Sequence, residues 1–364
     1  MSTDGPRSYA NAKSQIEQLI AVCRAKGTSS CLDSFRNQQP LQGPPWARGA
    51  YGGQLVAQAL LAAYETVPAS FSANSIHCHF LRPADVNLSI EYRVCRLHDG
   101  RGLTTRNIHA IQNQGIIMSA TVSFTRNRTK DQRQVLQHSA PIPRDESPPG
   151  DHPEAVTQSV AGQAGQGGPC DCVRSVLETK GPPNERKLRQ WVRARGRIQK
   201  IPPDAPGSIG VDNLTITGVR HDNHHVHVAA LAYMTDNYFI GTSFRVHNAS
   251  RFSQRMGSSV PSSVPADQEA WRALAAEEDR ENEGVPNNNM HVGMAASLDH
   301  TIFFHRPHDF RADEWLLSEM ESPWADDERG LVVGRIWNRE GKLVATCIQE
   351  GVIRMSKHDS GSKL

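Results

Sequence analysis

The sequence predicts an α+β fold that consists of two copies of one unit, because three short segments occur twice in the same order. An F-x-R-P-x-D motif, an Arg-Gly-Leu motif and an Ala-Tyr-x-Thr motif each return in the second half. The paired segments are 80–85 and 304–309, 101–103 and 329–331, and 63–66 and 232–235. Such repetition indicates a duplicated domain. At 364 residues, the chain has the length of two domains.

The first half is predicted to contain one buried helix followed by an antiparallel meander. Residues 13–26 are expected to form a short amphipathic helix at its start. A second helix opens at the Tyr-Gly-Gly-Gln of 51–54 and runs from Leu55 to Thr66. Its side chains are mostly small and apolar all round, which is typical of a helix that is buried on most faces. Strands are predicted at 74–81, 87–97, 103–113 and 115–126, with hairpin turns at Asp99-Gly100 and Gln114-Gly115.

The second half repeats this order after a segment of different composition. Residues 128–186 are rich in proline and include a Gly-Gln-rich run, so we interpret them as a linker. A strand near 187–198 then precedes a helix near 226–236. Strands are predicted at 294–305, 314–322, 329–338 and 342–354, with a turn at Glu340-Gly341. The stretch 241–290 is an insertion of the length at which a loop is either functional or disordered.

The chain is therefore divided into four parts. They are a first domain at 1–127, the linker at 128–186, a second domain at 187–356 with the insertion at 241–290, and a tail at 357–364. The tail ends in Ser362-Lys363-Leu364, and Ser-Lys-Leu at a free C-terminus is an address that the peroxisomal import receptor binds. We expect this receptor as a partner and the peroxisome as the location, with the cytoplasm as the alternative.

The composition argues against several classes of protein. The net charge is +2, with 40 basic and 38 acidic residues, which gives no support for a nucleic-acid partner or an anionic membrane surface. No apolar run is long enough to span a membrane, and the N-terminus has no apolar signal core. The seven cysteines are scattered, and we expect them to be reduced. The His-rich stretch 221–227 lacks an H-E-x-x-H spacing, so no metal site is predicted.

Four motifs, taken together and in order, resemble the acyl-CoA thioesterase II (TesB-like) family. They are Tyr-Gly-Gly-Gln at 51–54, Phe-Leu-Arg-Pro at 80–83, the run at 297–307 and Ile-Gln-Glu-Gly-Val at 348–352. The resemblance extends over about 45–127 and 186–355. It implies a double hot-dog fold, two tandem domains that each wrap an antiparallel sheet around a central helix, with the two sheets joined. It also implies hydrolysis of fatty acyl-CoA to free acid and CoA without a cofactor, and leaves a homo-oligomer open.

The resemblance implies three catalytic side chains in the second half, namely Asp236, Ser297 and Gln349. Ser297 stands where the family usually has Thr, so the hydroxyl is kept and a methyl group is lost. A thioester is a reactive acyl donor that water attacks directly. The attack needs a base, for which Asp236 is the candidate, and hydrogen bonds from Ser297 and Gln349 that orient the water. Burial is expected to raise the pKa of Asp236 above that of a free aspartate.

The candidate substrate-binding residues are Gly52, Gly53 and Gln54, at the start of the first buried helix. Backbone N–H groups at a helix N-terminus are common donors to the oxyanion that forms during acyl transfer. Glycine at this point lets the backbone approach the substrate closely.

The first half does not repeat the catalytic set. Val67 aligns with Asp236, and Thr121 aligns with Gln349. Asn74 also stands where the family often has a histidine. We therefore expect one active centre, built by the second half, with the first half shaping the channel for the acyl group and CoA.

Two other functions are left open. A hot-dog enoyl-CoA hydratase uses an Asp and a His five residues apart, and Asp222 and His227 have this spacing, although the Asn-Pro of the D-x-N-P-x-H motif is missing. A non-catalytic acyl-CoA-binding protein with the duplicated fold is the other alternative. A serine hydrolase with the α/β-hydrolase fold is not indicated, because the chain has no G-x-S-x-G motif.

Overall fold

The computed structural model describes most of both predicted domains. The described residues are 14–25, 33–44, 47–127, 135–150, 157–158, 168–174, 181–199, 223–252 and 290–356, with 272, 275, 276, 278 and 279. Asp222, most of the predicted insertion and the C-terminal Ser-Lys-Leu lie outside them. Within the described residues, no helix combines the length and the apolar character that crossing a membrane requires.

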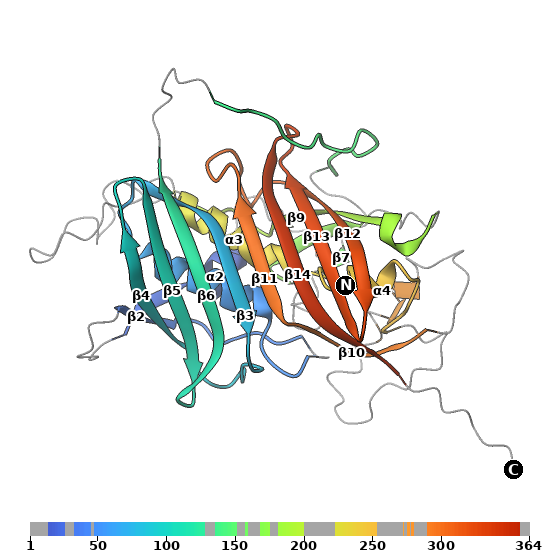
Figure 1. Cartoon of the computed structure of the whole chain (residues 1–364), viewed down its shortest axis with the longest axis horizontal. Helices are drawn as coiled ribbons and strands as arrows, with labels where there is room; N and C mark the ends of the chain where they lie inside the picture. Colours follow the sequence, from blue (N-terminus) through green and yellow to red (C-terminus); the bar gives the residue numbers. More distant parts are fainter. Residues whose placement is uncertain are drawn as a thin grey trace, which may run out of the picture.

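The described strands form one antiparallel sheet of 14 strands that continues through both halves (Figure 1). The strands of the first half are β1 Val22–Arg24, β2 Asp33–Asn37, β3 Phe71–Phe80, β4 Glu91–Asp99, β5 Leu103–Gln112 and β6 Gly115–Arg126. Those that follow are β7 Thr157–Gln158, β8 Cys170–Arg174, β9 Lys187–Ala194, β10 Val292–Ser297, β11 Asp299–Phe304, β12 Leu316–Asp326, β13 Arg329–Trp337 and β14 Leu343–Met355. Their order is β1-β2-β4-β5-β6-β3-β11-β14-β13-β12-β9-β8-β7, with β10 beside β14.

The centre of the sheet joins the two halves. Strand β3 of the first half pairs with β11 of the second, and Ile76 lies opposite Ile302 in this pair. Both isoleucines are fully buried. From this seam outward the strand order is the same in both directions, so β6 corresponds to β14, β5 to β13, β4 to β12 and β2 to β9. The predicted duplication and the joined sheets of a double hot-dog fold are thereby confirmed.

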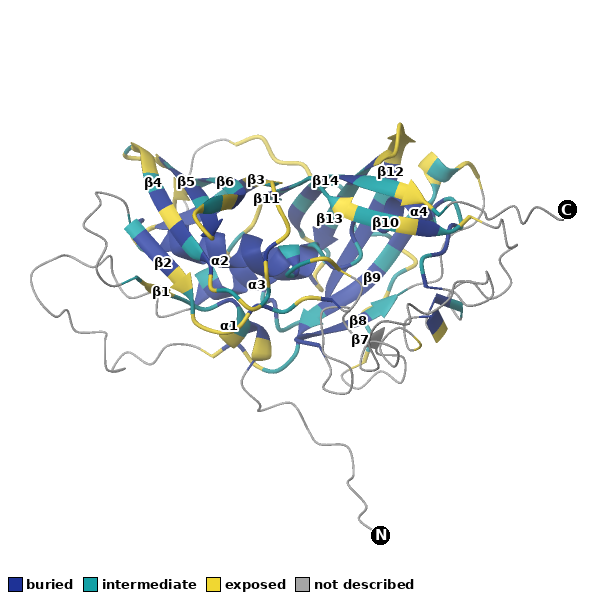
Figure 2. Cartoon of the chain, turned by 90° about the horizontal axis from the view of Figure 1, so that it is seen from below, coloured by how far each residue is buried: buried dark blue, intermediate teal, exposed yellow. Residues whose placement is uncertain are grey.

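Two buried helices, α2 (Gly52–Tyr64) and α3 (His224–Thr235), cover one face of the sheet. Figure 2 shows both in the dark blue of buried residues beneath the strands. Every residue of α2 from Gly53 to Tyr64 is buried, as the small apolar side chains predict. The remaining helices are short: α1 (Gln15–Leu19), α4 (Thr242–Arg245) and a 3₁₀ turn at Pro183–Glu185.

The predicted meander is wrong for the first strand after the helix. Strands β4, β5 and β6 do follow one another in the sheet, but β3 pairs with β6 and β11 and not with β4. This placement puts β3 at the centre of the molecule, where its second edge pairs with the other half. The sequence does not predict this position. A strand has the same alternation of side chains whether it pairs with β4, the next strand in the chain, or with β6.

Two local predictions also need correction. Of the helix predicted at 13–26, the described residues 14–25 are helical only at 15–19, and the chain continues into β1, which pairs with β2. The hairpin between β5 and β6 turns at Asn113 and Gln114, whose φ angles are 47° and 62°, and Gly115 already belongs to β6. A two-residue hairpin loop needs positive φ at both positions, and asparagine tolerates this conformation.

Part of the predicted linker belongs to the sheet and its outer face. Residues 170–174 form β8, which pairs with β9. Residues 135–150 pass over the outer face of the second half, the green segment at the top of Figure 1, where the indole of Trp337 donates to the Ala140 carbonyl at 3.0 Å. Trp191 similarly donates to Glu146 at 3.2 Å. These contacts cover an aromatic cluster that would otherwise be exposed.

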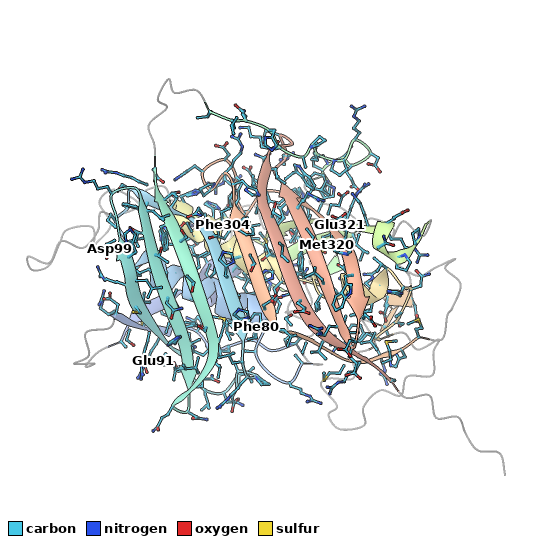
Figure 3. All side chains as sticks on the ribbon, in the orientation of Figure 1. Phe80, Glu91, Asp99, Phe304, Met320 and Glu321 are labelled. Carbon is cyan, nitrogen blue, oxygen red and sulfur yellow. The ribbon has the colours of Figure 1, made fainter. Side chains whose placement is uncertain are left out.

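The two F-x-R-P-x-D loops lie at opposite ends of the sheet. Phe80 and Phe304, which end the neighbouring antiparallel strands β3 and β11, are labelled at these ends in Figure 3. Each loop is held by an amide side chain that donates to the carbonyl of the motif's aspartate. Gln112 donates to Asp85 at 2.9 Å in the first half, and Asn338 donates to Asp309 at 2.7 Å in the second. The repeated motif therefore has the same structural role in both halves.

Candidate active site

Asp236 lies at the C-terminal end of the buried helix α3. It is the C-cap residue, with φ −85° and ψ −2°, and the N–H of Asn237 bonds back to Met234. Tyr238 then adopts a φ of 59°, and this left-handed conformation ends the helix. A carboxylate is thus carried into the interior by a helix that is otherwise almost wholly apolar.

Both halves of the molecule bind the carboxylate of Asp236. The backbone N–H of Gly53, in the first turn of α2, donates to Oδ2 at 2.8 Å. The Gln349 side chain, on β14, donates from Nε2 to Oδ1 at 2.8 Å. The N-terminus of α2 therefore points at the negative charge, which the helix dipole stabilises. The site is a junction of the two halves, not a property of the second half alone.

The glycines before Gln54 are needed for this close approach. A Cβ on Gly52 would lie 2.9 Å from Asp236 Oδ2 and 3.0 Å from the ring of Phe80. A Cβ on Gly53 would collide with the Tyr233 carbonyl oxygen. Tyr51 reinforces the contact, because its hydroxyl donates to the same Tyr233 carbonyl at 2.9 Å. Glycine at 52 and 53 thus serves to bring the two helices together.

The surroundings of Asp236 hold its pKa well above the ordinary value. Burial raises this pKa to about 6, although the hydrogen bonds from Gln349 and Gly53 lower it. The residue is half-buried, so solvent reaches part of its surface while packed protein surrounds the carboxylate. A carboxylate with this pKa is ionised at neutral pH and is basic enough to accept a proton from water.

Gln349 supplies a second polar atom to the site. Its side chain is fully buried, and it lies on the inner face of β14. Nε2 is used by Asp236, whereas Oε1 has no hydrogen-bond partner among the residues that the structure describes. A buried acceptor without a partner is rare and calls for a ligand or a water.

Ser297 shares the sheet face of Gln349. It ends β10, where it lies opposite Gly351 of β14. Residues 349 and 351 point to the same face because side chains alternate along a strand, and directly opposed residues also share a face. Ser297 is half-buried, and within the described part of the chain no side-chain hydrogen bond joins it to Asp236 or Gln349.

Gln54, predicted to bind substrate, has a structural role instead. Its side chain is fully buried. Its Oε1 accepts from the N–H of Gln42 at 2.9 Å, and its Nε2 donates to the Leu19 carbonyl at 3.0 Å. These bonds tie the segments before α2 to the helix and leave the amide unavailable to a ligand.

The ring of His300 is buried beside the last turn of α3. Its Nε2 lies 2.8 Å from the Thr235 hydroxyl, which itself donates to the Ala232 carbonyl. The hydroxyl proton is then already used, so His300 must donate from Nε2. Burial lowers the pKa of His300 to about 3, so the ring is neutral. The neighbouring Asp299 accepts from the N–H of Glu350 at 2.9 Å, so the Asp-His sequence signals a buried scaffold.

The first half has valines at the positions that correspond to Asp236 and Gln349. One of these two correspondences differs from the alignment predicted from the sequence. Val67 does occupy the place of Asp236, since Thr66 and Thr235 make the same bond to the last turn of their helices. The counterpart of Gln349 is Val122, not Thr121. Strand pairing through Phe80–Met118 and Phe304–Ala345 sets this register. Thr121 points to the outer face, because a shift of one residue changes the face.

The hydratase and metal alternatives gain no support at the His-rich stretch. His227 accepts the N–H of Ala312 at its Nδ1. The ring of His224 stacks on that of His308, with centroids 4.1 Å apart. Among the described residues, no group of three or more His, Cys, Asp or Glu side chains is arranged to hold a metal ion.

Comparisons with known proteins cover both halves. The family model for the acyl-CoA thioesterase N-terminal domain matches residues 42–125, and that for the C-terminal domain matches residues 213–353. Acyl-coenzyme A thioesterase 8 of Mus musculus is 30% identical over 341 residues, which are 88% of this chain and 85% of the mouse protein. Peroxisomal acyl-coenzyme A thioester hydrolase 1 of Saccharomyces cerevisiae is 26% identical over 371 residues and covers 97% of this chain and 98% of its own.

A solved structure shares the fold. The crystal structure of an acyl-CoA thioesterase II from Mycobacterium marinum superimposes with a TM-score of 0.54 and 23% identity, over 94% of this chain and 98% of that one. At this identity the likeness concerns the fold alone. It agrees with the joined antiparallel sheet and the paired helices described above.

Proposed function

The chain belongs to the acyl-CoA thioesterase II family and hydrolyses acyl-CoA to a free acid and CoA, and we propose that Asp236 activates the attacking water. The observation that carries this proposal is the binding of one carboxylate by Gly53 and Gln349 at the junction of the halves. Its raised pKa, the partial exposure of the Asp236 residue and the unpartnered Oε1 of Gln349 give this carboxylate the properties of a general base.

The reaction follows from these groups in two steps. A water donates one hydrogen bond to Asp236 and one to Oε1 of Gln349, and its oxygen attacks the thioester carbonyl carbon. Asp236 takes the proton as the new C–O bond forms. The tetrahedral intermediate then collapses with cleavage of the C–S bond, and protonated Asp236 returns the proton to the CoA thiolate. The products are the free acid and CoA, and the carboxylate of Asp236 is regenerated.

The oxyanion of the intermediate requires hydrogen-bond donors. The first N–H groups of a helix have no partner within the helix. The N–H of Gly53 is used by Asp236, whereas that of Gly52 has no acceptor among the described residues. We assign the Gly52 N–H to the oxyanion, where the helix dipole adds to the stabilisation. Ser297, on the sheet face of Gln349, is assigned to orient the water.

Substitution of Asp236 tests this mechanism. Asp236→Asn keeps the shape and removes the base, so kcat for acyl-CoA is expected to fall about 10²- to 10⁴-fold. Acyl-CoA binding, measured by calorimetry, should be retained. Asp326→Asn, which changes an exposed carboxylate on β12, is the matched control and should keep full thiol release. Full activity in Asp236→Asn would sink the mechanism.

We also propose import into the peroxisome. The support is the Ser362-Lys363-Leu364 tripeptide, which lies outside the described residues, and the name of the yeast relative. A fluorescent protein fused in front of the full chain should colocalise with a peroxisomal marker. A variant that lacks the three residues should stay diffuse. Equal distribution of the two fusions would contradict the proposal.

A further inference from the structure

A cavity of about 580 Å³ lies beside the N-terminus of α2. Two loops form its walls, the segment that leads into α2 and the first F-x-R-P-x-D loop. The lining residues are Leu41, Gln42, Gly43, Pro44, Ala47 and Arg48, with Gly49 and the run 83–87. This volume lies within the range of small-molecule sites.

The walls of this cavity are fixed to each other. The N–H of Ala50 donates to the Ala84 carbonyl at 2.8 Å, which links the two loops. Glycines permit the close approach, since a Cβ on Gly49 would lie 2.8 Å from the same carbonyl oxygen and one on Gly43 would lie 2.9 Å from Val86. The cavity is therefore built into the fold.

The same loop connects the cavity to the candidate base. The N–H of Tyr51 donates to the Gln42 carbonyl at 2.7 Å, and Gly53 binds Asp236. Gly53 follows Gly49 of the cavity wall by only four positions in the chain. Such a segment spans at most ~14 Å. A substrate arm that starts at the reacting carbonyl can therefore reach the cavity.

Two charged side chains line the cavity. Arg48 is exposed and takes part in no ion pair within the described part of the chain. Asp85 lies in the other wall, and its Oδ1 already accepts from the N–H and the side-chain amide of Asn87 at 2.9 and 3.1 Å. Leu41, Pro44 and Val86 add apolar surface. A guanidinium without an ion pair beside short apolar side chains fits an uncharged arm that ends in phosphate.

The cavity at the second copy of the motif is different. It measures about 200 Å³ and is lined by Asp309, Arg311 and Glu314, among others. Two of its charged residues are paired within the protein, Asp309 with Arg306 at 3.0 Å and Arg311 with Asp313 at 2.7 Å, whereas Arg339 and Glu340 take part in no ion pair within the described residues. This cavity also lies at the opposite end of the sheet from Asp236, where the first half has only Val67 and Val122. Of the two cavities, the larger one lies at the end of the sheet that carries Asp236.

We propose that the cavity lined by 41–44, 47–49 and 83–87 binds the pantetheine and phosphate arm of the CoA thioester, with Arg48 contacting a phosphate. This assignment rests on the function proposed above. It adds the orientation in which the acyl-CoA lies relative to Asp236. The acyl chain then extends from Asp236 away from this cavity.

Two thioesters of one acyl group test the assignment. Hexanoyl-CoA carries the whole arm, whereas hexanoyl-N-acetylcysteamine lacks the phosphates and most of the arm. The measured quantity is the ratio of kcat/KM for the two substrates. Arg48→Gln removes a charged hydrogen bond, so this ratio is expected to fall about tenfold, through KM for hexanoyl-CoA. Val86→Trp fills the cavity and should lower the same ratio. Arg339→Gln, in the second cavity, should leave it unchanged.

The outcomes separate this assignment from the mechanism. An equal loss for both substrates, or a loss that grows with acyl chain length, would show that the cavity holds the acyl group and would overturn the assignment. An unchanged ratio in Arg48→Gln and Val86→Trp would overturn it too. Failure of Asp236 as the base would appear instead as a normal kcat for Asp236→Asn with both substrates. Added salt should raise KM for hexanoyl-CoA in the wild type and less so in Arg48→Gln.

Discussion

At the scale of single residues, the environment of Asp236 balances two opposing effects. Burial favours the neutral acid, whereas the hydrogen bonds from Gln349 and Gly53 favour the carboxylate, and burial wins. The base is thus kept near the pH at which it must both lose and accept a proton. A fully solvated aspartate would be too weak a base, and an isolated buried one would stay protonated at neutral pH.

The pH dependence of kcat reports this balance. Activity requires ionised Asp236, so kcat should fall as the pH drops through about 6, the pKa of this residue. Gln349→Met removes a hydrogen bond to the charged form, which raises the pKa, so the acidic limb should move to higher pH. The measurement is a kcat profile of thiol release for both proteins. A limb that stays in place or moves to lower pH in Gln349→Met would contradict the assignment.

Residue types could be predicted at this site better than their contacts. Asp236 and Gln349 were predicted as partners in the site, and a hydrogen bond of 2.8 Å joins them. Gln54 was predicted to bind substrate because it continues a glycine motif, but its side chain bonds backbone groups of the segments before α2, at Leu19 and Gln42. Thr121 was aligned with Gln349 because pattern matching tolerates a shift of one residue. In a strand, a shift of one residue moves the side chain to the opposite face of the sheet.

At the scale of elements, the short strand β8 supports the end of α3. Arg174, its last residue, lies over the ring of Tyr238 with 3.3 Å between Cζ and the ring centroid. Tyr238 is the residue with positive φ that ends the helix after Asp236. From β9, Gln190 donates to the Asn237 carbonyl at 3.3 Å. The strained turn is thus clamped by two strands that neighbour each other in the sheet.

Loosening this clamp should impair catalysis more than binding. Arg174→Ala removes the cation over Tyr238, and the helix end that carries Asp236 gains freedom. We expect kcat to fall about tenfold with little change in KM, because small misplacements of a catalytic group are costly. Arg174→Lys should restore part of the rate. Arg193→Ala, which removes an arginine over Trp315, is the matched control. A parallel fall in both alanine variants would indicate general destabilisation instead.

Strand β8 also shows which elements escape sequence analysis. The buried helices and the long strands carry their own patterns, and most of their ends were predicted to within a few residues. The single strand predicted at 294–305 is instead two strands, β10 and β11, which both pair with β14. β8 spans only Cys170–Arg174, inside a segment whose prolines and glycines suggest a linker. Its conformation is set by pairing with β9, and such a tertiary contact leaves no local pattern.

At the scale of the whole molecule, the active centre depends on contact between the halves. The first half supplies Gly53 and Tyr51 to the end of α3, and the second supplies Asp236 and Gln349. The duplication is symmetric in its sheet, helices and motif loops. It is asymmetric in composition, because the candidate base Asp236 stands at one helix junction and Val67 at the other. The sequence predicts one centre built by the second half, whereas Gly53 of the first half also binds the carboxylate of Asp236.

A single methyl group at the helix junction tests this dependence. Gly53→Ala places a Cβ against the Tyr233 carbonyl, so α2 must move away from α3 and its N–H from Asp236. We expect a loss of about 1–3 kcal/mol in unfolding free energy from overpacking. We also expect kcat to fall at temperatures well below Tm, where the variant is still folded. Gly102→Ala, where an added Cβ meets nothing within 4 Å, should change neither. Because Gly53 belongs to the half without the base, a normal kcat in Gly53→Ala would mean that the second half carries out the reaction alone.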